Sequence, residues 1–266
     1  MPRIGIDLGG TKIEGIVLES DDRVSLRERV ATPTGDYAAT MAAVAGLIER
    51  LQRRRGDRCS VGVGTPGSLS PATGRLRNAN STCLNGQTPD RDLAALLGRP
   101  VRIANDADCF ALSEATDGAA GGMRSVFGVI IGTGTGGGIV IDRNLLHGPN
   151  AIAGEWGHNP LPWPHDDEHP GPPCYCGKRG CIETFLSGPG MSRDYVNDAL
   201  PSSALVIVQR AAAGEPAAVA CLDRYADRLA RCLASVINVL DPDAIVLGGG
   251  LSNIEHLYTA VPQRWG

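Results

Sequence analysis

Two segments of the chain repeat one local pattern, in which a glycine-rich turn joins two strands. The first starts at Arg3 and reads "RIGIDLGGTKIEGIVLES"; the second starts at Ser125 and reads "SVFGVIIGTGTGGGIVID". Glycine in such turns permits a positive φ and lets the backbone approach a ligand closely. The internal echo predicts two related α/β domains. We place them at residues 1–120 and 121–266, with the boundary in "DGAAGGMRS".

Helices and further strands are expected between and after these segments. Asp36 is placed to cap a helix over 37–55, whose last turn is basic. We expect strands at "CSVGVGTPG" and "VRIAND", and helices at "PDRDLAALLG", from Asp106 to about Ala120, and at about 202–213 and 217–240. The stretch from about Leu146 to Pro173 is rich in Pro, Gly and His and is far longer than a usual loop, which indicates a function.

Composition excludes several classes of protein. The 266 residues suffice for two domains, and the 42% hydrophobic content suits a globular core. A net charge of −4 argues against a nucleic-acid surface, which needs a basic face. No run reaches the ~18 apolar residues of a membrane helix, and the first residues do not resemble a secretory signal. We therefore expect a cytoplasmic protein that binds small molecules, not nucleic acid or a membrane.

Three glycine turns carry the main functional signal. They are Asp7–Lys12 ("DLGGTK"), Gly132–Gly138 ("GTGTGGG") and Gly248–Gly250 ("GGG"). Successive backbone N–H groups in such turns form an anion cradle, although a hairpin favours glycine anyway. The sequence contains no G-x-x-x-x-G-K-[ST] motif. Gly132, Gly134 and Gly137 match G-x-G-x-x-G by letter, but a strand follows where the dinucleotide fingerprint needs a helix.

Two facing hairpins and a third turn that opens a helix are similar to the hexokinase–actin superfamily. In these ATP-dependent enzymes ATP lies in a cleft between two such domains. The resemblance implies an α/β, two-domain hexokinase/actin-like (ribonuclease H-like) fold with an interdomain cleft. Asp7 would then hold Mg²⁺, directly or through water, or merely satisfy turn donors. Thr11 would help to cradle phosphate oxygens, and Lys12 is an extra charge or a solvated side chain.

Carboxylates elsewhere suggest a sugar site. Asp106, in "RIANDADCF", is a candidate helix N-cap and also a candidate general base for a substrate hydroxyl, and the two roles are compatible. Asn105 precedes it, and Glu155 and Glu183 flank a cluster of cysteine and histidine. Several carboxylates and an amide converging on one site suit a sugar, whose hydroxyls both donate and accept.

The stretch "CYCGKRGCIE" places Cys174, Cys176 and Cys181 within eight residues. Disulfides are rare in the cytosol, and the C-x-C spacing is too tight for a conventional disulfide ladder. Three thiolates and one imidazole would form a closed tetrahedral zinc site. Spacing leaves the histidine open among His158, His165 and His169. The other five cysteines are expected to be small buried hydrophobes.

Five motifs in order now resemble one family: "DLGGTK", "NDAD", "IGTGTGGGI", "GEWGH" and "CYCGKRGCIE". The chain is similar, from Ile4 to about Val261, to the ROK family of bacterial sugar kinases, repressors and open reading frames. Within that family, "NANSTCLNGQ" and "GEWGHNPLPW" look most like bacterial fructokinases and mannokinases. The family pattern continues past the third glycine turn with a strand and a terminal helix, and this sequence is shorter by some tens of residues.

The resemblance implies a role for each matched position. Asp106 is the catalytic base. The residues implied for ATP are Asp7, Gly9, Gly10, Thr11 and Lys12 of the first turn, Gly132, Thr133, Gly134, Thr135, Gly136, Gly137 and Gly138 of the second, and Gly248, Gly249 and Gly250 near the adenosine. Those implied for the sugar are Asn105, Asp106, Glu155, His158 and Glu183, and the zinc ligands are His158, Cys174, Cys176 and Cys181.

The implied activity is phosphorylation of a hexose at its 6-hydroxyl by ATP and Mg²⁺, with structural Zn²⁺. Fructose is the first candidate sugar, with mannose beside it; a glucokinase or N-acetylglucosamine kinase is the alternative. From another class, a catalytically impaired sugar-binding protein is suggested by the shorter sequence. A repressor of the family would carry a helix-turn-helix before the first glycine turn, which here begins by Gly9. Family members often form homodimers, but no interface can be identified in the sequence.

Overall fold

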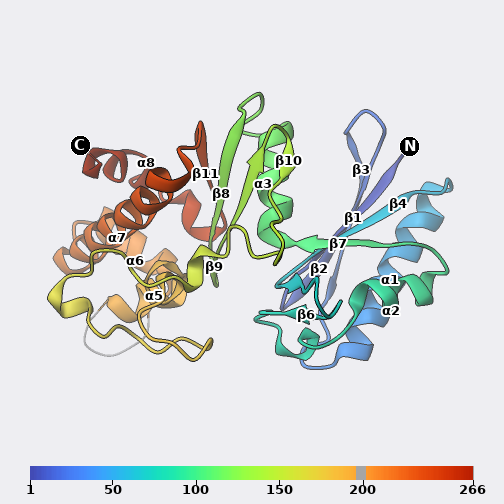
Figure 1. The fold of residues 1–266 in the computed structure, drawn as a ribbon, viewed down its shortest axis with the longest axis horizontal. Helices are drawn as coiled ribbons and strands as arrows, with labels where there is room; N and C mark the ends of the chain where they lie inside the picture. Colours follow the sequence, from blue (N-terminus) through green and yellow to red (C-terminus); the bar gives the residue numbers. More distant parts are fainter. Residues whose placement is uncertain (196–201, 266) are drawn as a thin grey trace. The chain divides into compact units, whose positions relative to one another are not determined.

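The computed structural model describes residues 1–195 and 202–265 (Figure 1). Contacts divide the chain into two compact units. Unit 1 comprises Met1–Cys109 and His147–Ala153, and unit 2 comprises Phe110–Leu146 and Gly154–Gly266. The division falls inside helix α3 (Asp106–Thr116), not at the expected position near residue 120, because α3 starts in unit 1 and packs in unit 2. Of the expected second domain, residues 196–201 and 266 lie outside the described residues.

Unit 1 is built on a five-stranded sheet with the order β3-β2-β1-β4-β7. Its strands are β1 (Arg3–Leu8), β2 (Lys12–Leu18), β3 (Val24–Ala31), β4 (Ser60–Thr65) and β7 (Arg102–Asn105). The first three are antiparallel, as the strand–turn–strand pattern predicts, whereas β1, β4 and β7 are parallel. The carboxyl ends of β1 and β7, which carry Asp7 and Asn105, therefore point the same way.

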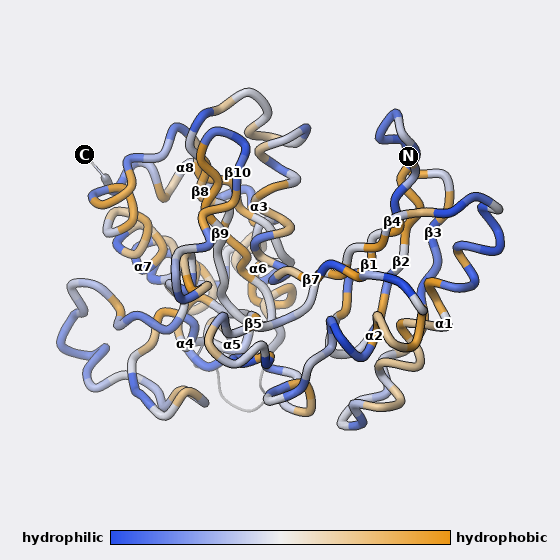
Figure 2. Tube along the Cα trace, turned by 45° about the vertical axis from the view of Figure 1, so that its right-hand side comes forward, coloured by the Kyte–Doolittle hydropathy of each residue, from blue (hydrophilic) through white to orange (hydrophobic). Residues whose placement is uncertain are grey.

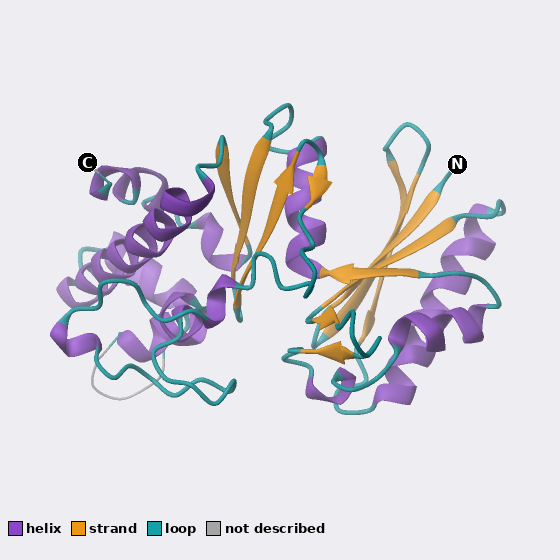
Figure 3. Cartoon of the chain, viewed as in Figure 1, coloured by secondary structure: helices purple, strands orange, loops and turns teal. Residues whose placement is uncertain are grey.

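Two helices cover one face of this sheet (Figure 3). They are α1 (Tyr37–Arg55), capped by Asp36 as predicted, and α2 (Pro89–Leu97). Alternate residues of β1 and β2, such as Ile4, Ile6 and Ile13, form the core with the apolar face of α1. The smaller elements are β5 (Ser68–Leu69), β6 (Leu76–Arg77) and the 3₁₀ turn η1 (Thr82–Leu84).

Unit 2 has a four-stranded sheet with the order β10-β9-β8-β11. Its strands are β8 (Ser125–Ile131), β9 (Thr135–Ile141), β10 (Asn144–Leu145) and β11 (Ala244–Gly248). The alternation along β8 separates two cores: Phe127, Val129 and Ile131 face the helical layer, whereas Val126 packs with the side of α3. Figure 2 shows the hydrophobic colouring of β8.

The remaining helices pack on the first of these cores. They are α4 (Ile182–Leu186), α5 (Gly188–Asp194), α6 (Ala204–Ala212), α7 (Pro216–Leu240) and α8 (Leu257–Ala260), with 3₁₀ turns η4 (Gly250–Asn253) and η5 (Pro262–Arg264). The helices expected at about 202–213 and 217–240 are confirmed as α6 and α7. Within the described ranges, no single helix has the length and apolar composition to cross a membrane; α6 and α7 pass that test only as a pair bent by 116°.

The segment between β10 and α4 is irregular, as its Pro, Gly and His content predicts. It holds only the 3₁₀ turns η2 (Trp156–His158) and η3 (Asp166–Glu168). Of the five single cysteines, Cys59, Cys221 and Cys232 are buried as expected. The prediction is wrong for Cys109, which is exposed on α3, and Cys83 is only partly buried.

Candidate active site

The first glycine turn is a tight hairpin between β1 and β2. The Gly9 N–H donates to the Lys12 carbonyl at 3.1 Å, and a Cβ on Gly9 would lie 2.9 Å from that carbonyl oxygen. Ser81, from the "NANST" segment, lies against Gly10. Asp7 lies one residue before the end of β1, beside this turn. Partial desolvation and the charge of Glu14 raise the pKa of Asp7, while Lys12 opposes them.

Asn105 and Asp106 occupy the junction of β7 and α3 in the same unit. The Asn105 side-chain oxygen accepts the N–H of Ala107 at 2.9 Å and that of Asp108 at 3.2 Å, so Asn105 provides the cap that the sequence assigned to Asp106. The Asn105 amide donates to the Gly67 carbonyl at 3.1 Å, which fixes its orientation. Because α3 already starts at Asp106, the N-cap position falls one residue earlier, at Asn105.

Asp106 lies in an environment that disfavours its charge. Burial raises the pKa of Asp106; the hydrogen bond from the Ala107 N–H opposes this, and the negative charge of Asp7 adds to it. Asp7 and Asp106 are ninety-nine positions apart in sequence, yet each strand end places its carboxylate within electrostatic reach of the other. Unit 1 therefore brings the predicted magnesium residue and the predicted base together.

The second glycine turn joins β8 to β9 in unit 2. Gly132 closes it by donating its N–H to the Gly134 carbonyl at 2.9 Å. The Thr135 N–H donates to a carboxylate oxygen of Glu183 at 2.9 Å, and a Cβ on Gly134 would lie 2.7 Å from that oxygen. Glu183, in the first turn of α4, therefore contacts this turn directly, which explains why Gly134 has no side chain.

The "GEWGH" segment is anchored to the same strand. Trp156, buried against Phe127 with rings 5.4 Å apart, donates its indole N–H to the Gly136 carbonyl at 2.9 Å. A Cβ on Gly157 would lie 2.0 Å from the Thr135 carbonyl oxygen. The sequence analysis did not predict this anchoring role of Trp156. The available signal was the position of a tryptophan between two candidate site residues, Glu155 and His158. The anchor fixes the loop that bears Glu155 and His158.

Four predicted metal ligands come together in unit 2. The ligand atoms of His158, Cys174, Cys176 and Cys181 all lie within 4.8 Å of one another. Cys174 Sγ is 3.5 Å from His158 Nδ1, and Cys176 Sγ is 3.6 Å from Cys181 Sγ. The Cys174 N–H donates to the Lys178 carbonyl at 2.8 Å and thereby folds the C-x-C segment back on itself.

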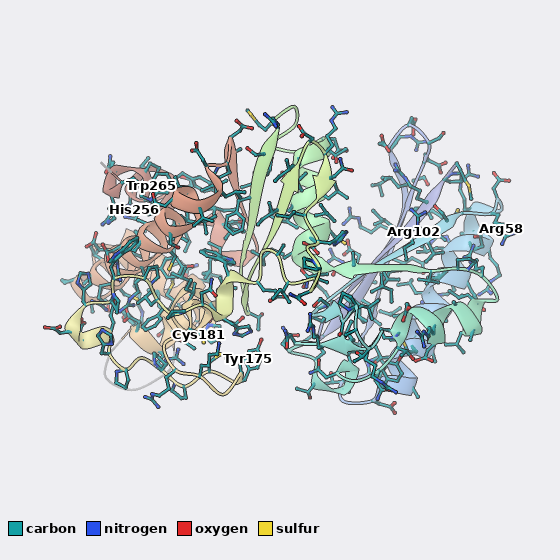
Figure 4. All side chains as sticks on the ribbon, viewed as in Figure 1. Arg58, Arg102, Tyr175, Cys181, His256 and Trp265 are labelled. Atoms are coloured by element: carbon teal, nitrogen blue, oxygen red, sulfur yellow. The ribbon has the colours of Figure 1, made fainter. Side chains whose placement is uncertain are left out.

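The other ring nitrogen of His158 faces Tyr175. His158 Nε2 and the Tyr175 hydroxyl are 3.0 Å apart, and the two rings meet edge to face at 5.1 Å. Tyr175 lies on the long loop and Cys181 directly before α4, as the labels in Figure 4 indicate. The sequence left His165 and His169 open as alternative ligands, but neither belongs to the cluster. His165 Nε2 lies instead 3.4 Å from a carboxylate oxygen of Asp227.

A buried ion network holds the same long loop to α7. Glu168 is 6% exposed and Arg228 is 5% exposed, and their charged atoms are 2.7 Å apart. Arg231 lies 2.9 Å from the same carboxylate, and Arg228 also pairs with Asp194 at 2.8 Å. Burial alone would raise the pKa of Glu168, but hydrogen bonds from Arg228 and Arg231 outweigh it and lower the pKa.

The third glycine turn borders a cavity of about 570 Å³ in unit 2. Gly249 has a φ of 85°, and a Cβ on Gly248 would lie 2.5 Å from the Phe110 ring. The walls come from the second and third turns and from α5 and α6: Gly132, Thr133, Gly188, Pro189, Ser192, Ser203, Ala204, Leu205, Val208, Gly250, Leu251, Asn253 and Ile254. The α6 wall was not predicted from sequence, because nothing local marks Leu205 or Val208.

These features define a two-domain α/β protein with the actin-like fold of sugar kinases. The family model for the ROK family matches residues 3–265, and the chain belongs to that family. The sequence is 42% identical over 266 residues to the N-acetyl-D-glucosamine kinase of Photobacterium profundum, covering 98% of this chain and 88% of the relative.

Two solved structures share the fold. The ROK hexokinase of Thermus thermophilus has a TM-score of 0.85 at 33% identity, covering 100% of this chain and 88% of that one. A ROK family glucokinase from Streptomyces griseus, solved with glucose and AMPPNP, has a TM-score of 0.80 at 26% identity, with the same coverage of both chains. The fold class and the family expected from the motifs are confirmed.

Proposed function

We propose that the chain is an ATP-dependent hexose kinase that phosphorylates a sugar at its 6-hydroxyl. The observation that carries this proposal is Asp106, fixed at the start of α3 with a raised pKa and within electrostatic reach of Asp7. A carboxylate with a raised pKa is a stronger base, which favours removal of a proton from a sugar hydroxyl. Membership of a family that includes sugar kinases supports the same activity.

The phosphoryl transfer would rest on positioning and charge. Asp106 would take the proton of the attacking hydroxyl, as the base does in other phosphoryl transfers. Asp7 would hold Mg²⁺, directly or through water, because hard divalent cations prefer oxygen ligands. The bound Mg²⁺ would neutralise charge on the phosphates. Gly9, Gly10 and the neighbouring Thr11 and Lys12 would approach the phosphates from this turn.

The nucleotide would occupy the cavity of unit 2. Its volume of about 570 Å³ lies in the range of small-molecule pockets, and its walls include apolar side chains of α6 and η4. Gly132–Gly138 would cradle phosphates through backbone N–H groups, and Gly248–Gly250 would lie near the adenosine. The Streptomyces griseus relative, solved with AMPPNP, supports ATP as the donor.

The sugar would be held by acceptors from several elements. By the family resemblance, Asn105 and Asp106 would contribute from the start of α3, and Glu155 and Glu183 from the long loop and α4. Carboxylates accept hydrogen bonds from sugar hydroxyls, and buried partners left unpaired would penalise the wrong sugar. His158 would also contact the sugar. Closure over the bound sugar would exclude water, which could otherwise accept the phosphoryl group.

The Cys/His cluster would hold structural Zn²⁺. With Zn–S near 2.3 Å and Zn–N near 2.0–2.1 Å, tetrahedral ligand atoms lie roughly 3.5–3.8 Å apart. The 3.5 Å separation of Cys174 Sγ from His158 Nδ1 and the 3.6 Å separation of Cys176 Sγ from Cys181 Sγ fit that geometry. Zinc would tie His158 and the residue before α4 together, and so would position Glu183 and the loop that bears Glu155.

Two sugars compete as substrate. The "NANSTCLNGQ" and "GEWGHNPLPW" segments favour D-fructose, with mannose beside it. The name of the Photobacterium profundum relative favours N-acetyl-D-glucosamine. The site groups named above serve either sugar, since every hexose offers several hydroxyls to carboxylates. We further propose that the protein acts in the cytoplasm and that it forms a homodimer, the latter as expected from the family resemblance.

The test is ADP release by the purified protein with ATP and Mg²⁺ over a panel of fructose, mannose, glucose and N-acetylglucosamine. The preferred sugar is the one with the highest kcat/KM. Absence of sugar-dependent ADP release from every hexose would remove the proposal. Calorimetry with each sugar alone distinguishes the kinase from the alternative. Binding without turnover would identify a catalytically impaired sugar-binding protein. Size-exclusion chromatography with light scattering tests the homodimer.

A further inference from the structure

Thr32, directly after β3, has no role in the function proposed so far, yet it contacts the first glycine turn at two points. Its hydroxyl donates to the Gly9 carbonyl, 23 positions away in sequence, at 2.7 Å. Its backbone N–H donates to the Thr11 carbonyl at 3.1 Å. One residue of unit 1 therefore holds the carbonyls on both sides of Gly10.

The contact with Gly9 fixes the direction of the next N–H group. The peptide unit between Gly9 and Gly10 is trans, and the C=O and N–H of a trans peptide point to opposite sides. The Gly9 carbonyl points at Thr32, so the Gly10 N–H points away from the segment that bears Thr32. Gly10 is exposed, and no group within residues 1–195 or 202–265 accepts this N–H. The N–H is therefore open to an anionic ligand.

The segment that bears Thr32 is anchored to α1. The Pro33 carbonyl accepts the Asp36 N–H at 3.4 Å, and the Thr40 hydroxyl lies 3.0 Å from the same carbonyl. Thr40 is 2% exposed and precedes Met41, which belongs to the core of unit 1. Because the segment is tied to a buried helix, the Thr32 hydroxyl is a fixed donor behind an exposed turn.

We propose that Thr32 is a positioning residue of the kinase, whose hydroxyl aims the Gly10 N–H at a phosphate oxygen of ATP before the nucleotide binds. This inference rests on the proposed function, which places the ATP phosphates at this turn. Without the hydroxyl the Gly9–Gly10 peptide can rotate, since glycine has the widest backbone freedom. Binding would then have to order the turn, which weakens affinity for the phosphates but not for the base or the sugar.

The experiment compares AMPPNP, which carries the phosphates, with adenosine, which carries none, by calorimetry in the presence of Mg²⁺. Thr32→Val keeps the shape of the side chain and removes the hydroxyl. We expect its Kd for AMPPNP to rise about two- to tenfold, the range for one lost neutral hydrogen bond, and its KM for ATP to rise with it. Its Kd for adenosine and for the preferred hexose should stay at the wild-type values. Thr32→Ser, which retains a hydroxyl, should restore the affinity for AMPPNP.

Thr259→Val is the matched control, because the Thr259 hydroxyl also donates to a main-chain carbonyl, that of His256 at 3.1 Å, in unit 2. It should bind both ligands as the wild type does. Three results for Thr32 would each overturn the inference: an unchanged Kd for AMPPNP in Thr32→Val, an equal loss of adenosine binding, or a Thr32→Ser protein that behaves like Thr32→Val.

The same measurements separate this inference from the proposed function. If the wild-type protein binds AMPPNP but releases no ADP with any hexose, the kinase activity is wrong, and the comparison of AMPPNP with adenosine still decides the role of Thr32. A wild-type protein that binds no AMPPNP would overturn both.

Discussion

At the scale of residues, Asp106 combines two demands that conflict. A general base must be rigid and strongly basic, and both properties come from partial burial at the start of α3, next to Asp7. The same burial disfavours the charged form. A carboxyl whose folded-state pKa is raised stabilises the fold below its unfolded pKa and loses that contribution as pH rises through the folded pKa. Above its folded-state pKa, the ionised Asp106 therefore costs stability.

Replacing Asp106 by Asn should separate activity from stability. We expect kcat to fall by about 10²–10⁴, the usual contribution of a general base. Sugar affinity should change little, because the amide still offers an acceptor oxygen. The Tm measured above the pKa of Asp106 should rise, since a buried charge has been removed. Coupled ADP assays, calorimetry and thermal unfolding measure the three quantities.

Asp117→Asn, on an exposed residue just beyond α3, is the control and should match the wild type in all three measurements. Normal turnover by Asp106→Asn would exclude Asp106 as the base. In the wild-type protein, kcat/KM should fall as pH drops through the pKa of Asp106. Because that pKa is raised, the fall should begin at a higher pH than for an ordinary aspartate.

At the scale of elements, the irregular loop before α4 has almost no secondary structure, and two polar attachments hold it in addition to the buried Trp156. One is the Cys/His cluster, which joins η2 to the residue before α4. The other is the Glu168 carboxylate on Arg228 and Arg231 of α7. Figure 2 colours much of this loop hydrophilic, although Trp156 and Leu161 are buried in the core of unit 2. Each attachment can be removed separately.

Removing one thiolate tests the first attachment. Cys176→Ala should lose the bound zinc, because three remaining ligands hold the ion much less tightly than four. The sugar KM should rise, since Glu155 and Glu183 are no longer held together, while the far-ultraviolet circular dichroism stays close to wild type. Zinc is measured by atomic absorption and KM by the coupled assay.

Cys59→Ala is the matched control, since Cys59 is a buried thiol of unit 1 outside the cluster. It should retain zinc and the wild-type KM. A Cys176→Ala protein that keeps stoichiometric zinc and normal kinetics would refute the role assigned to the cluster. Exhaustive chelation of the wild-type protein should reproduce the effect of the substitution, and added zinc should reverse it.

The second attachment is tested by Arg228→Met. This change leaves the buried Glu168 with one of its two cations and should lower the free energy of unfolding by about 3–5 kcal/mol in urea titrations. Arg53→Met is the control, because the ion pair of Arg53 with Glu49 is exposed and its loss should change stability by less than about 1 kcal/mol. Equal stabilities of the two variants would mean that the network contributes nothing.

The pH dependence of this network follows from the lowered pKa of Glu168. A carboxyl with a depressed folded-state pKa contributes stability above its unfolded pKa, near 4.5, and loses it as pH falls through the folded pKa. The wild-type protein should therefore lose stability below about pH 4.5. The variant Arg228→Met should lose less over the same interval, since it has less of this contribution to lose.

At the scale of the whole molecule, local patterns predicted what depends on short stretches of sequence. The two hairpins, α1 with its Asp36 cap, and the helices α6 and α7 follow from periodicity, glycine and capping residues. Features that depend on packing across the chain could not be predicted. Three features show this. The helix cap is Asn105, one residue before the expected Asp106. The contact of Trp156 with Gly136 and the ion pair of Glu168 with Arg228 each join segments that are distant in sequence. No local property of the sequence marks the Asn105 cap or the Glu168–Arg228 pair.

The same limit applies to the cavity proposed for the nucleotide, which yields the last prediction. Its walls combine two glycine turns with Leu205 and Val208 of α6. Val208→Phe should fill part of the cavity and abolish the rise in Tm that AMPPNP gives the wild-type protein. At a ligand concentration of 100 times Kd, that rise corresponds to about 2.7 kcal/mol.

Sugar affinity of Val208→Phe should stay at the wild-type value, because the groups proposed for the sugar do not line the cavity. The matched control is Val219→Phe on α7, at a side chain that is 47% exposed and outside the cavity; it should keep both responses. Thermal shifts with AMPPNP and with the hexose, each alone, decide the matter. An undiminished AMPPNP shift in Val208→Phe would place the nucleotide elsewhere, while loss of both shifts would mean that the substitution disturbs unit 2 as a whole.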